Sequence, residues 1–367
     1  MADVELPPPD HPEPPFGRTR HPYFMHDMIR RQSVATHATR RSIREALAAA
    51  PIPPPVGTVL TVGLGTSFHA ALATAWAFGR SPRVAGAEAW TAFDLLQRPE
   101  RLASRPTTVV FSASGETALT VAALHRLRAA GAPTLLVTAT PGSPAAALAD
   151  RVLATEHSAE TSWVHTVSFT TALAAAGVLL ESWAGVDGSG EDRDAQATDD
   201  VTGGLATESA MVTLAEALTG RDRYLLVGGG AAEASAREGA LKLREGAGKF
   251  SAWVGVEELL HGVLPSVTER TAVVGFSTTA LERARLREGL HAAELVGART
   301  VLIDASGAPA AEGTVVVPPS SGPLASAVMV IPVQLLTYWV ALSDGRNPDV
   351  MGLDDPRLME ARRTFGI

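Results

Sequence analysis

One pattern of apolar and glycine-rich segments occurs twice in this chain. In the first half, an apolar run ends at Gly63 and a second ends at Ser112, 49 residues later (112 − 63). In the second half, Gly228 and Ser277 end matching runs that are again 49 residues apart (277 − 228). Each second unit continues to a Gly-Ala-x-Thr segment and a further strand-like run. Because such spacing is hard to obtain by chance, we predict a tandem duplication of one α/β domain.

Small hydroxyl side chains follow both strands of the first copy. Thr66 and Ser67 come after the first strand, and Ser112, Ser114 and Thr117 come after the second. In an open parallel sheet, ligands bind at the carboxyl ends of the strands, where backbone N–H groups and helix N-termini attract anions. We therefore expect a phosphate monoester to bind here through neutral donors. The alternative is that these side chains only cap helices, but two such loops at corresponding strand ends favour a ligand site.

Three sequence motifs stand out in the chain. They are Gly65-Thr66-Ser67-x-His69-Ala70-Ala71-Leu72, Ser112-x-Ser114-Gly115-Glu116-Thr117 and Glu238-Gly239-Ala240-Leu241-Lys242-Leu243-Arg244-Glu245. Together they resemble the double sugar isomerase (SIS) proteins, which include the isomerase half of glucosamine-6-phosphate synthase and the related aminosugar-phosphate deaminases and isomerases. The resemblance runs from about Met25 to the C-terminus, and it implies that the first two motifs bind a phosphosugar through Gly65, Thr66, Ser67, Ser112, Ser114, Gly115 and Thr117.

The third motif carries groups for proton transfer. Lys242 and Glu245 are three residues apart on a helical pattern, so they share one face. Aldose–ketose interconversion needs a base that moves a proton between C1 and C2, and an acid/base that opens the sugar ring. The resemblance implies that Glu245 moves the proton with Lys242 beside it. Without the motif, an exposed ion pair would be the ordinary interpretation of this spacing.

His261 is the second candidate for acid–base chemistry. The resemblance implies that it opens the ring in the active site of a neighbouring subunit, which would make the protein an obligate homodimer with shared active sites. The alternative is a hydrogen-bonded structural histidine.

Two segments depart from the synthase pattern. Residues 163–171 lack the serine and lysine of the synthase loop, and His165 stands near the expected sugar. At the C-terminus, Ala361 takes the place of the lysine that forms an imine with the ketose, and Arg362 follows. Arginine remains protonated and cannot form an imine. Residues 347–349 resemble the tails of the deaminase–isomerase relatives instead.

Composition excludes several classes of function. The chain has 367 residues, no cysteine and a formal net charge of −8. This length predicts two domains. The absence of cysteine excludes disulfides, a zinc–thiolate site and the cysteine-dependent glutaminase of the synthase. With no basic stripe, we expect no nucleic-acid partner.

We also expect no cofactor and no metal. Neither glycine loop completes the GxGxxG pattern of dinucleotide-binding folds. His157, Glu160 and His165 do not have the spacing of a standard metal site. The longest apolar runs, 171–180 and 328–342, fall short of the roughly 20 residues of a membrane span, and the start of the chain lacks the apolar core of a signal peptide. We expect a cytoplasmic protein with no membrane partner.

The predicted fold is α/β, with two tandem doubly wound parallel-sheet SIS domains of flavodoxin-like or Rossmann-like type. A helical pattern over residues 26–50 should pack across the first domain, and residues 328–342 should form a buried helix. The expected segments are a disordered proline-rich arm (1–20), the first, phosphosugar-binding domain (21–186), an acidic linker (187–205), the second domain, which carries the catalytic Glu and His (206–346), and an extended tail that could fold back over a site (347–367).

These observations predict an enzyme that isomerises a 6-phosphosugar, most simply an aminosugar phosphate, with or without loss of ammonia. The alternative from another class is a phosphosugar-sensing SIS protein that has lost turnover. Sugar amination with free ammonia ranks below both, because the imine-forming lysine is missing.

Overall fold

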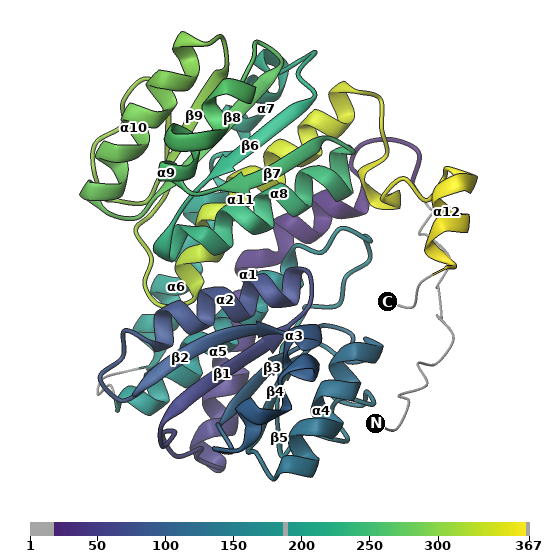
Figure 1. Ribbon diagram of the computed structural model, residues 1–367, viewed down its shortest axis with the longest axis vertical. Coiled ribbons are helices and arrows are strands. Elements are labelled where there is room, and N and C mark those ends of the chain that lie inside the picture. The colour runs from purple at the N-terminus through teal and green to yellow at the C-terminus, as the bar shows by residue number, and fades with distance from the viewer. Residues whose placement is uncertain (1–17, 186–189, 365–367) are drawn as a thin grey trace.

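The computed structural model describes residues 18–185 and 190–364, which form two α/β domains (Figure 1). Each domain contains one five-stranded sheet in which all neighbouring strands are parallel. The predicted tandem repeat of doubly wound α/β domains is confirmed.

The two sheets have the same strand order. In the first sheet the order is β2-β1-β3-β4-β5, and in the second it is β7-β6-β8-β9-β10. This is the order of flavodoxin-like folds, whose ligand crevice lies where the chain changes direction, at the first and third strands. The strands are β1 (Thr58–Gly63), β2 (Gly86–Thr91), β3 (Thr108–Phe111), β4 (Thr134–Thr138), β5 (Arg151–Ala154), β6 (Arg223–Val227), β7 (Phe250–Val254), β8 (Thr271–Ser277), β9 (Arg299–Asp304) and β10 (Thr314–Val316).

The register of the central strands shows how closely the copies correspond. Leu60 of β1 pairs with Thr108 of β3, and Leu225 of β6 pairs with Val273 of β8. Both residues of the second pair lie 165 positions after those of the first (225 − 60 and 273 − 108). Residues 165 positions apart are therefore equivalent in the two central strands, and the same offset relates Gly63 to Gly228 and Ser112 to Ser277.

Helices cover both faces of each sheet. In the first domain, α3 (Ala92–Gln97) and α4 (Ala118–Ala130) pack on the outer face, while α2 (Thr66–Phe78) and α5 (Val167–Ala184) pack on the inner face. In the second domain, α9 (Val256–Glu258) and α10 (Ala280–Leu295) lie outside, and α8 (Glu233–Ala247) and α11 (Leu324–Ser343) lie inside. The inner helices of the two domains contact one another, α2 with α8 and α5 with α11.

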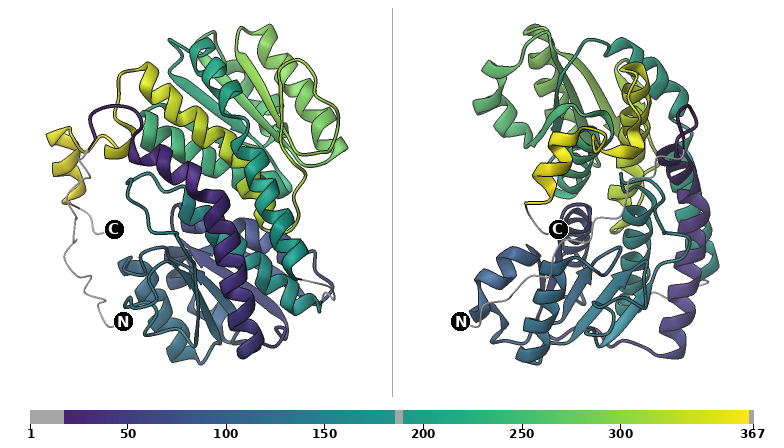
Figure 2. Two further views of the ribbon diagram at one scale, coloured as in Figure 1. Left: turned by 180° about the vertical axis from the view of Figure 1, so that it is seen from behind. Right: turned by 90° about the vertical axis from the view of Figure 1, so that its right-hand side faces the viewer.

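A single apolar core runs through both domains by way of these inner helices. It includes Phe78 and Trp183 from the first domain and Tyr224 and Tyr338 from the second, all of them almost fully buried. The helix α1 (Phe24–Ala49) extends this core, because it packs on α5 and also contacts α11 across the domain boundary (Figure 2). The predicted helix near the start of the chain is confirmed. Each large apolar side chain buried here stabilises the fold by about 1.5–3 kcal/mol.

The predicted acidic linker is helical from Gly190 onward. Residues 190–205 form α6 (Gly190–Leu205), which buries Ala197, Val201 and Leu205 and packs against α1 and α11. A second helix, α7 (Glu208–Ala217), follows at once and leads into β6. Residues 187–189 of the predicted linker, and residues 1–17 of the predicted arm, lie outside the described residues.

The two apolar runs belong to helices that are longer than the runs themselves. α5 has 18 residues and α11 has 20, so by length and composition either helix is long enough to cross a membrane. Both are mostly buried inside the protein, however, and α11 is the predicted buried helix. They are core helices.

The C-terminal segment folds into short helices, so the prediction of an extended tail was wrong. It contains a 3₁₀ turn, Pro348–Val350, and the helix α12 (Pro356–Arg362). The carboxylate of Asp349 accepts hydrogen bonds from the backbone N–H groups of Phe24 (2.8 Å) and Met25 (2.7 Å), which open α1. A carboxylate at this position satisfies free helix donors and is favoured by the helix dipole. The end of the chain is thereby attached to its first helix.

We predict that Asp349→Ala lowers the free energy of unfolding by about 1–2 kcal/mol, the usual cost of losing a helix cap. Urea unfolding followed by circular dichroism would measure the shift. Asp354→Ala, in the exposed part of the same segment, is the matched control and should change the free energy by no more than about 0.5 kcal/mol. Equal midpoints for Asp349→Ala and the wild type would contradict this role.

Candidate active site between the two domains

The loop between β1 and α2 supplies the first part of the site. Gly63 must be glycine, because a Cβ atom there would lie 2.4 Å from the carbonyl of Ser67. Gly65 stands at the N-cap of α2 with a φ of 53°, a left-handed conformation that glycine adopts easily. Thr66 and Ser67 therefore begin α2 directly beside the end of the strand.

The loop between β3 and α4 supplies the second part. Ser112 Oγ accepts a hydrogen bond from the N–H of Gly115 (3.1 Å), and Ser114 Oγ accepts one from the N–H of Glu116 (3.2 Å). Gly115 has a φ of 67°, and a Cβ atom there would meet the side chain of Ser143. Thr117 is the N-cap of α4 and makes no side-chain capping bond.

Among the described residues, no side chain caps either α2 or α4. The alternative in which the hydroxyls only cap these helices therefore does not account for them. A small pocket opens where the two loops meet, and His165 and Ser168 close it from the segment before α5 and from its first turn. Thr66, Ser67 and Ser112 all line it. Free helix N–H groups and hydroxyls at one point form a site for an anion.

A buried charged cluster lies next to this pocket and joins the two domains. The ammonium group of Lys242, on α8, is fully buried and contacts Glu238 Oε1 (3.2 Å) and Glu245 Oε2 (2.6 Å). It also donates hydrogen bonds to the first domain, to Thr66 Oγ1 (3.2 Å) and to the carbonyl of His165 (2.9 Å). The first and third sequence motifs thus meet in space.

Glu238 completes this cluster. It accepts hydrogen bonds from Thr66 Oγ1 (3.1 Å), and its other oxygen lies 2.7 Å from Nδ1 of His69. Burial alone would raise the pKa of Glu238, but Lys242 and His69 outweigh it and hold the pKa at about 2. Burial likewise disfavours the charged form of Lys242, and the two glutamates reverse this effect and raise its pKa. Both groups are charged at neutral pH.

Glu245 differs from Glu238 in its exposure and in its pKa. Its side chain retains 19% of its accessible surface, whereas that of Glu238 has none. Burial raises the pKa of Glu245, and Lys242 only partly offsets this. A carboxylate with a raised pKa, next to an ammonium group and partly exposed, can accept and return a proton.

His165 lines the pocket just before α5, and the buried Glu160 holds the start of that helix. Glu160 Oε1 accepts hydrogen bonds from the N–H groups of Thr166 (2.6 Å) and Ser168 (2.8 Å), so it caps α5. Burial raises the pKa of Glu160 to about 7 despite these bonds. Burial and the nearby Lys242 lower the pKa of His165 to about 4, so its imidazole is neutral at neutral pH.

His261 lies apart from the cluster. It stands on a π-helical turn, Leu259–Val263, in the second domain, where its side chain is 76% exposed and 3.3 Å from Glu257. The structure therefore brings Lys242 and Glu245 together with the hydroxyl loops within one chain, and leaves His261 on the surface.

The C-terminal helix lies beside the same site. The guanidinium group of Arg362 is 5.4 Å from the ring centre of Trp163, in the segment that precedes α5. Burial lowers the pKa of Arg362, while Glu245, within electrostatic reach, raises it. Ala361 is exposed on α12.

Glu238 and His69 lie within two of the sequence motifs, but neither was predicted to have a role. The i, i+4 spacing of Glu238 and Lys242 indicates that the two side chains are neighbours on a helix. The same spacing usually gives exposed ion pairs, so it does not predict a buried one. No sequence pattern indicated that Glu160 caps α5. The first N–H group that donates to it belongs to Thr166, six positions later in the chain. Within the described ranges, no group of three or more His, Cys, Asp or Glu residues is placed to hold a metal ion.

We predict that Glu238→Gln destabilises the protein by about 3–5 kcal/mol at neutral pH, because it leaves a buried ammonium group with one partner fewer. The pKa of Glu238 falls on folding from 4.5 to about 2, so its contribution to stability is complete above 4.5 and is lost as the pH falls toward 2. The difference between wild type and variant in urea unfolding should shrink over that interval. Glu233→Gln, in a partly exposed ion pair on the same helix, should cost about 1 kcal/mol or less. A difference independent of pH would contradict the charged cluster.

Comparison with known proteins identifies the family. The SIS domain profile matches residues 55–182 and 217–343. The glutamine–fructose-6-phosphate aminotransferase (isomerizing) of Thermococcus kodakarensis is 28% identical over 347 residues, which cover 90% of this chain and 56% of that protein. The protein of the same name from Streptomyces coelicolor is 29% identical over 310 residues, 80% of this chain and 50% of its own length. The chain spans about half the length of these relatives.

Solved structures share the whole double-domain fold. The C-terminal domain of glucosamine-fructose-6-phosphate aminotransferase from Francisella tularensis aligns with a TM-score of 0.74 at 21% identity, covering 90% of this chain and 98% of that one. Glucosamine-6-phosphate deaminase from Thermotoga maritima aligns with a TM-score of 0.73 at 23% identity, covering 89% and 96%. The two segments that match the SIS profile together make up more than half of the chain, and each contains one of the two sheets. This protein therefore belongs to the SIS domain family and contains two SIS domains in tandem.

Proposed function

We propose that this protein is a phosphosugar aldose–ketose isomerase that acts on a 6-phosphosugar, most simply an aminosugar phosphate, and releases the amino group as ammonia. One observation carries the proposal. The Lys242–Glu245 pair of the second domain meets the hydroxyl loops of the first domain through Thr66. An anion-binding loop and a proton-transfer pair are thereby within reach of one small substrate.

The phosphate group would bind in the first domain. Thr66, Ser67 and Ser112 line the pocket, and the uncapped start of α4 at Thr117 offers free N–H groups. Ser114 and Gly115 shape the loop between them. Helix N-termini and hydroxyl donors suit a phosphate monoester.

Glu245 would be the base of the reaction. It takes the C2 proton of the open-chain aminosugar and delivers it to C1. A proton of the C2 amine passes to the C1 oxygen, so the aldehyde becomes a CH2OH group and the amine becomes an imine. Water then adds to that imine, and ammonia leaves to give the ketose phosphate. The ammonium group of Lys242, 2.6 Å from Glu245, would stabilise the negative charge that develops in the enediol-type intermediate.

His261 and Arg362 distinguish this proposal from its alternatives. The surface position of His261 is compatible with ring opening in a partner's active site, so a homodimer with shared sites is part of the proposal. Arg362 lies near the place of the imine-forming lysine of the synthase, and it cannot form an imine. His165, which is neutral, would contact the sugar. These features favour isomerisation and deamination over amination by free ammonia. The proposed enzyme is cytoplasmic.

The experiment that tests the function is a panel of sugar phosphates with two readouts, ammonia release and ketose formation. Glucosamine 6-phosphate, its N-acetyl derivative and glucose 6-phosphate cover the amino, acetamido and hydroxyl substituents. Release of ammonia from the first substrate alone would support the deaminase. Binding of the substrates without turnover of any of them would instead identify a phosphosugar sensor.

We predict that Glu245→Gln retains substrate binding but lowers turnover by about 10²–10⁴-fold, the usual contribution of general acid–base catalysis. The amide keeps the size of the side chain and cannot accept the proton. In deuterated water, the wild type should place solvent deuterium at C1 or C2 of recovered sugar, and the variant should not. Glu216→Gln, on the exposed face of α7, is the control and should turn over like the wild type. Wild-type turnover in Glu245→Gln would remove this residue from the mechanism.

We predict that two inactive variants recover activity when their subunits exchange. A hybrid dimer of Glu245→Gln and His261→Ala contains one site in which both groups are wild type, if His261 acts across the interface. Mass spectrometry of the intact dimer would show that subunits had exchanged. Confirmed exchange without any activity would exclude the shared site.

A further inference from the structure

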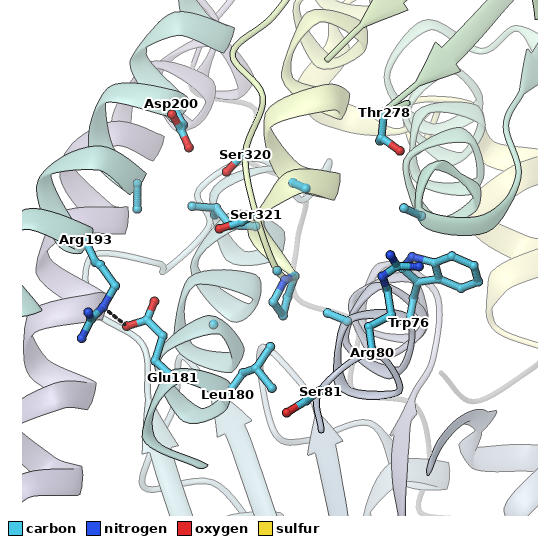
Figure 3. Close-up of a pocket in the computed structure, with 18 of the residues that line it drawn as sticks. Trp76, Arg80, Ser81, Leu180, Glu181, Arg193, Asp200, Thr278, Ser320 and Ser321 are labelled. Atoms are coloured by element: carbon cyan, nitrogen blue, oxygen red, sulfur yellow. Dashed lines mark hydrogen bonds and ion pairs between the residues drawn. The ribbon is translucent and has the colours of Figure 1, made fainter. Parts of the chain in front are cut away.

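A large cavity lies between the two domains, at the opposite end of α2 from the candidate active site (Figure 3). Its volume is about 630 Å³, within the range of small-molecule sites. The end of α2, together with α5 and α6, forms one part of the wall, and the loops that precede α10 and α11 form the other. Trp76, Arg80, Asp200 and Ser320 stand around its opening in Figure 3.

The internal repeat makes this cavity the counterpart of the active site. The active site combines loops of the first domain with α8 of the second, whereas the cavity combines loops of the second domain with α2 of the first. With the offset of 165, Lys242 and Glu245 correspond to Ala77 and Arg80 (242 − 165 and 245 − 165). Both equivalents line the cavity.

The cavity lacks the chemistry of its counterpart. By the sequence offset, Thr117 at the open helix start of the first domain matches Glu282 (117 + 165), which lies in the first turn of α10. The carboxylate of Glu282 accepts hydrogen bonds from the N–H groups of Thr278 (2.8 Å) and Thr279 (3.2 Å), so a group of the protein itself occupies the anion position of this loop. Ala77 replaces the buried lysine. A ligand bound here would meet no proton-transfer pair.

The lining indicates what kind of ligand fits. Trp76 is 45% exposed and offers a flat apolar surface. Arg80, four residues further on and just past the end of α2, is exposed, and its guanidinium group has no hydrogen-bond or ion-pair partner among the residues that the structure describes. Across the cavity, the hydroxyls of Ser320 and Ser321 are suited to bind hydroxyl groups. Asp200 lies beside them and is largely buried, and its Oδ1 accepts a hydrogen bond from Gln196 (2.8 Å). The lining thus matches a flat ring, one acidic group and sugar-like hydroxyls.

We propose that this cavity is a second ligand site, which binds a nucleoside monophosphate or an anion of the same chemistry and does not turn it over. The base lies on Trp76, the phosphate meets Arg80 and the ribose hydroxyls face Ser320 and Ser321. Aromatic stacking and a charge-assisted bond to arginine are the two interactions that hold such molecules in proteins.

The ligand site and the active site share the antiparallel helices α2 and α8. α2 begins at Thr66 in the active site and reaches the cavity at Trp76, where a Cβ atom on Gly230 would lie 3.2 Å from the indole. From Gly230 the chain runs through α8 back to Lys242 in the active site. Binding at the cavity does not rest on the proposed function.

Calorimetric titration of the full chain with adenosine and uridine monophosphates tests the proposal. Arg80→Ala and Trp76→Ala should each weaken binding about tenfold or more, the effect of losing a bond to a charged group or a stacked ring. Arg83→Ala, an exposed arginine outside the cavity, is the matched control and should bind like the wild type. Ser321→Trp places an indole in the cavity from an exposed loop, so it should block binding without disturbing the core.

Four results would overturn the proposal. The first is that the wild type binds no nucleotide at millimolar concentrations, and the second is that Ser321→Trp binds as tightly as the wild type. The third is that glucosamine 6-phosphate displaces the nucleotide and Ser67→Ala abolishes its binding. The fourth is that only sugar phosphates without an aromatic base bind in a way that depends on Arg80. The third result would place the nucleotide in the active-site pocket. Turnover of the sugar-phosphate panel is measured separately, so an inactive protein that binds nucleotide through Arg80 would reject the proposed function and retain this site.

Discussion

The burial of one ammonium group constrains much of this structure. Lys242 has no exposed surface, and a buried charge is tolerated only when opposite charges and hydrogen-bond partners surround it. Glu238 and Glu245 supply the charge from the same helix, and Thr66 and the carbonyl of His165 supply acceptors from the other domain. The two domains must therefore keep one relative position at this point.

The same constraint separates the roles of the two carboxylates. Glu238 is fully enclosed, accepts bonds from Thr66 and faces His69, so its charge is fixed and its pKa is held low. Glu245 shares the ammonium group, keeps some contact with solvent and has a raised pKa. Two similar side chains on one helix thus have different acidities, because only one of them is saturated with donors.

The sequence was sufficient to predict the duplicated fold and the hydroxyl loops, because both depend on local patterns. Gly63 and Gly228 mark strand ends where the backbone must turn closely, and the spacing to Ser112 and Ser277 is visible along the chain. The sequence was not sufficient where tertiary contacts decide the conformation. Residues 190–205 contain glycine and acids and were assigned to a linker, yet a stripe that includes Ala197 and Val201 packs them as a helix on α1.

Other features had a weak local signal or none. Asp349 caps a helix that begins more than 300 residues earlier, so its role depends on a contact that only the fold creates. The ion pair of Lys242 and Glu238 has the same spacing as countless exposed pairs, and burial alone makes it different. The position of Glu282, whose carboxylate fills the second anion loop, was visible only as a change in motif.

The shared core also bears on the origin of the protein. Two equivalent domains that face each other through equivalent helices are related by an approximate twofold axis, the geometry of an isologous dimer. A single-domain ancestor that paired in this way would have had two identical crevices, each completed by a helix of the other copy. In such a dimer every substitution changes both crevices at once. Fusion of the two copies into one chain removes that coupling, and it leaves one crevice free to keep its chemistry while the other acquires a different lining.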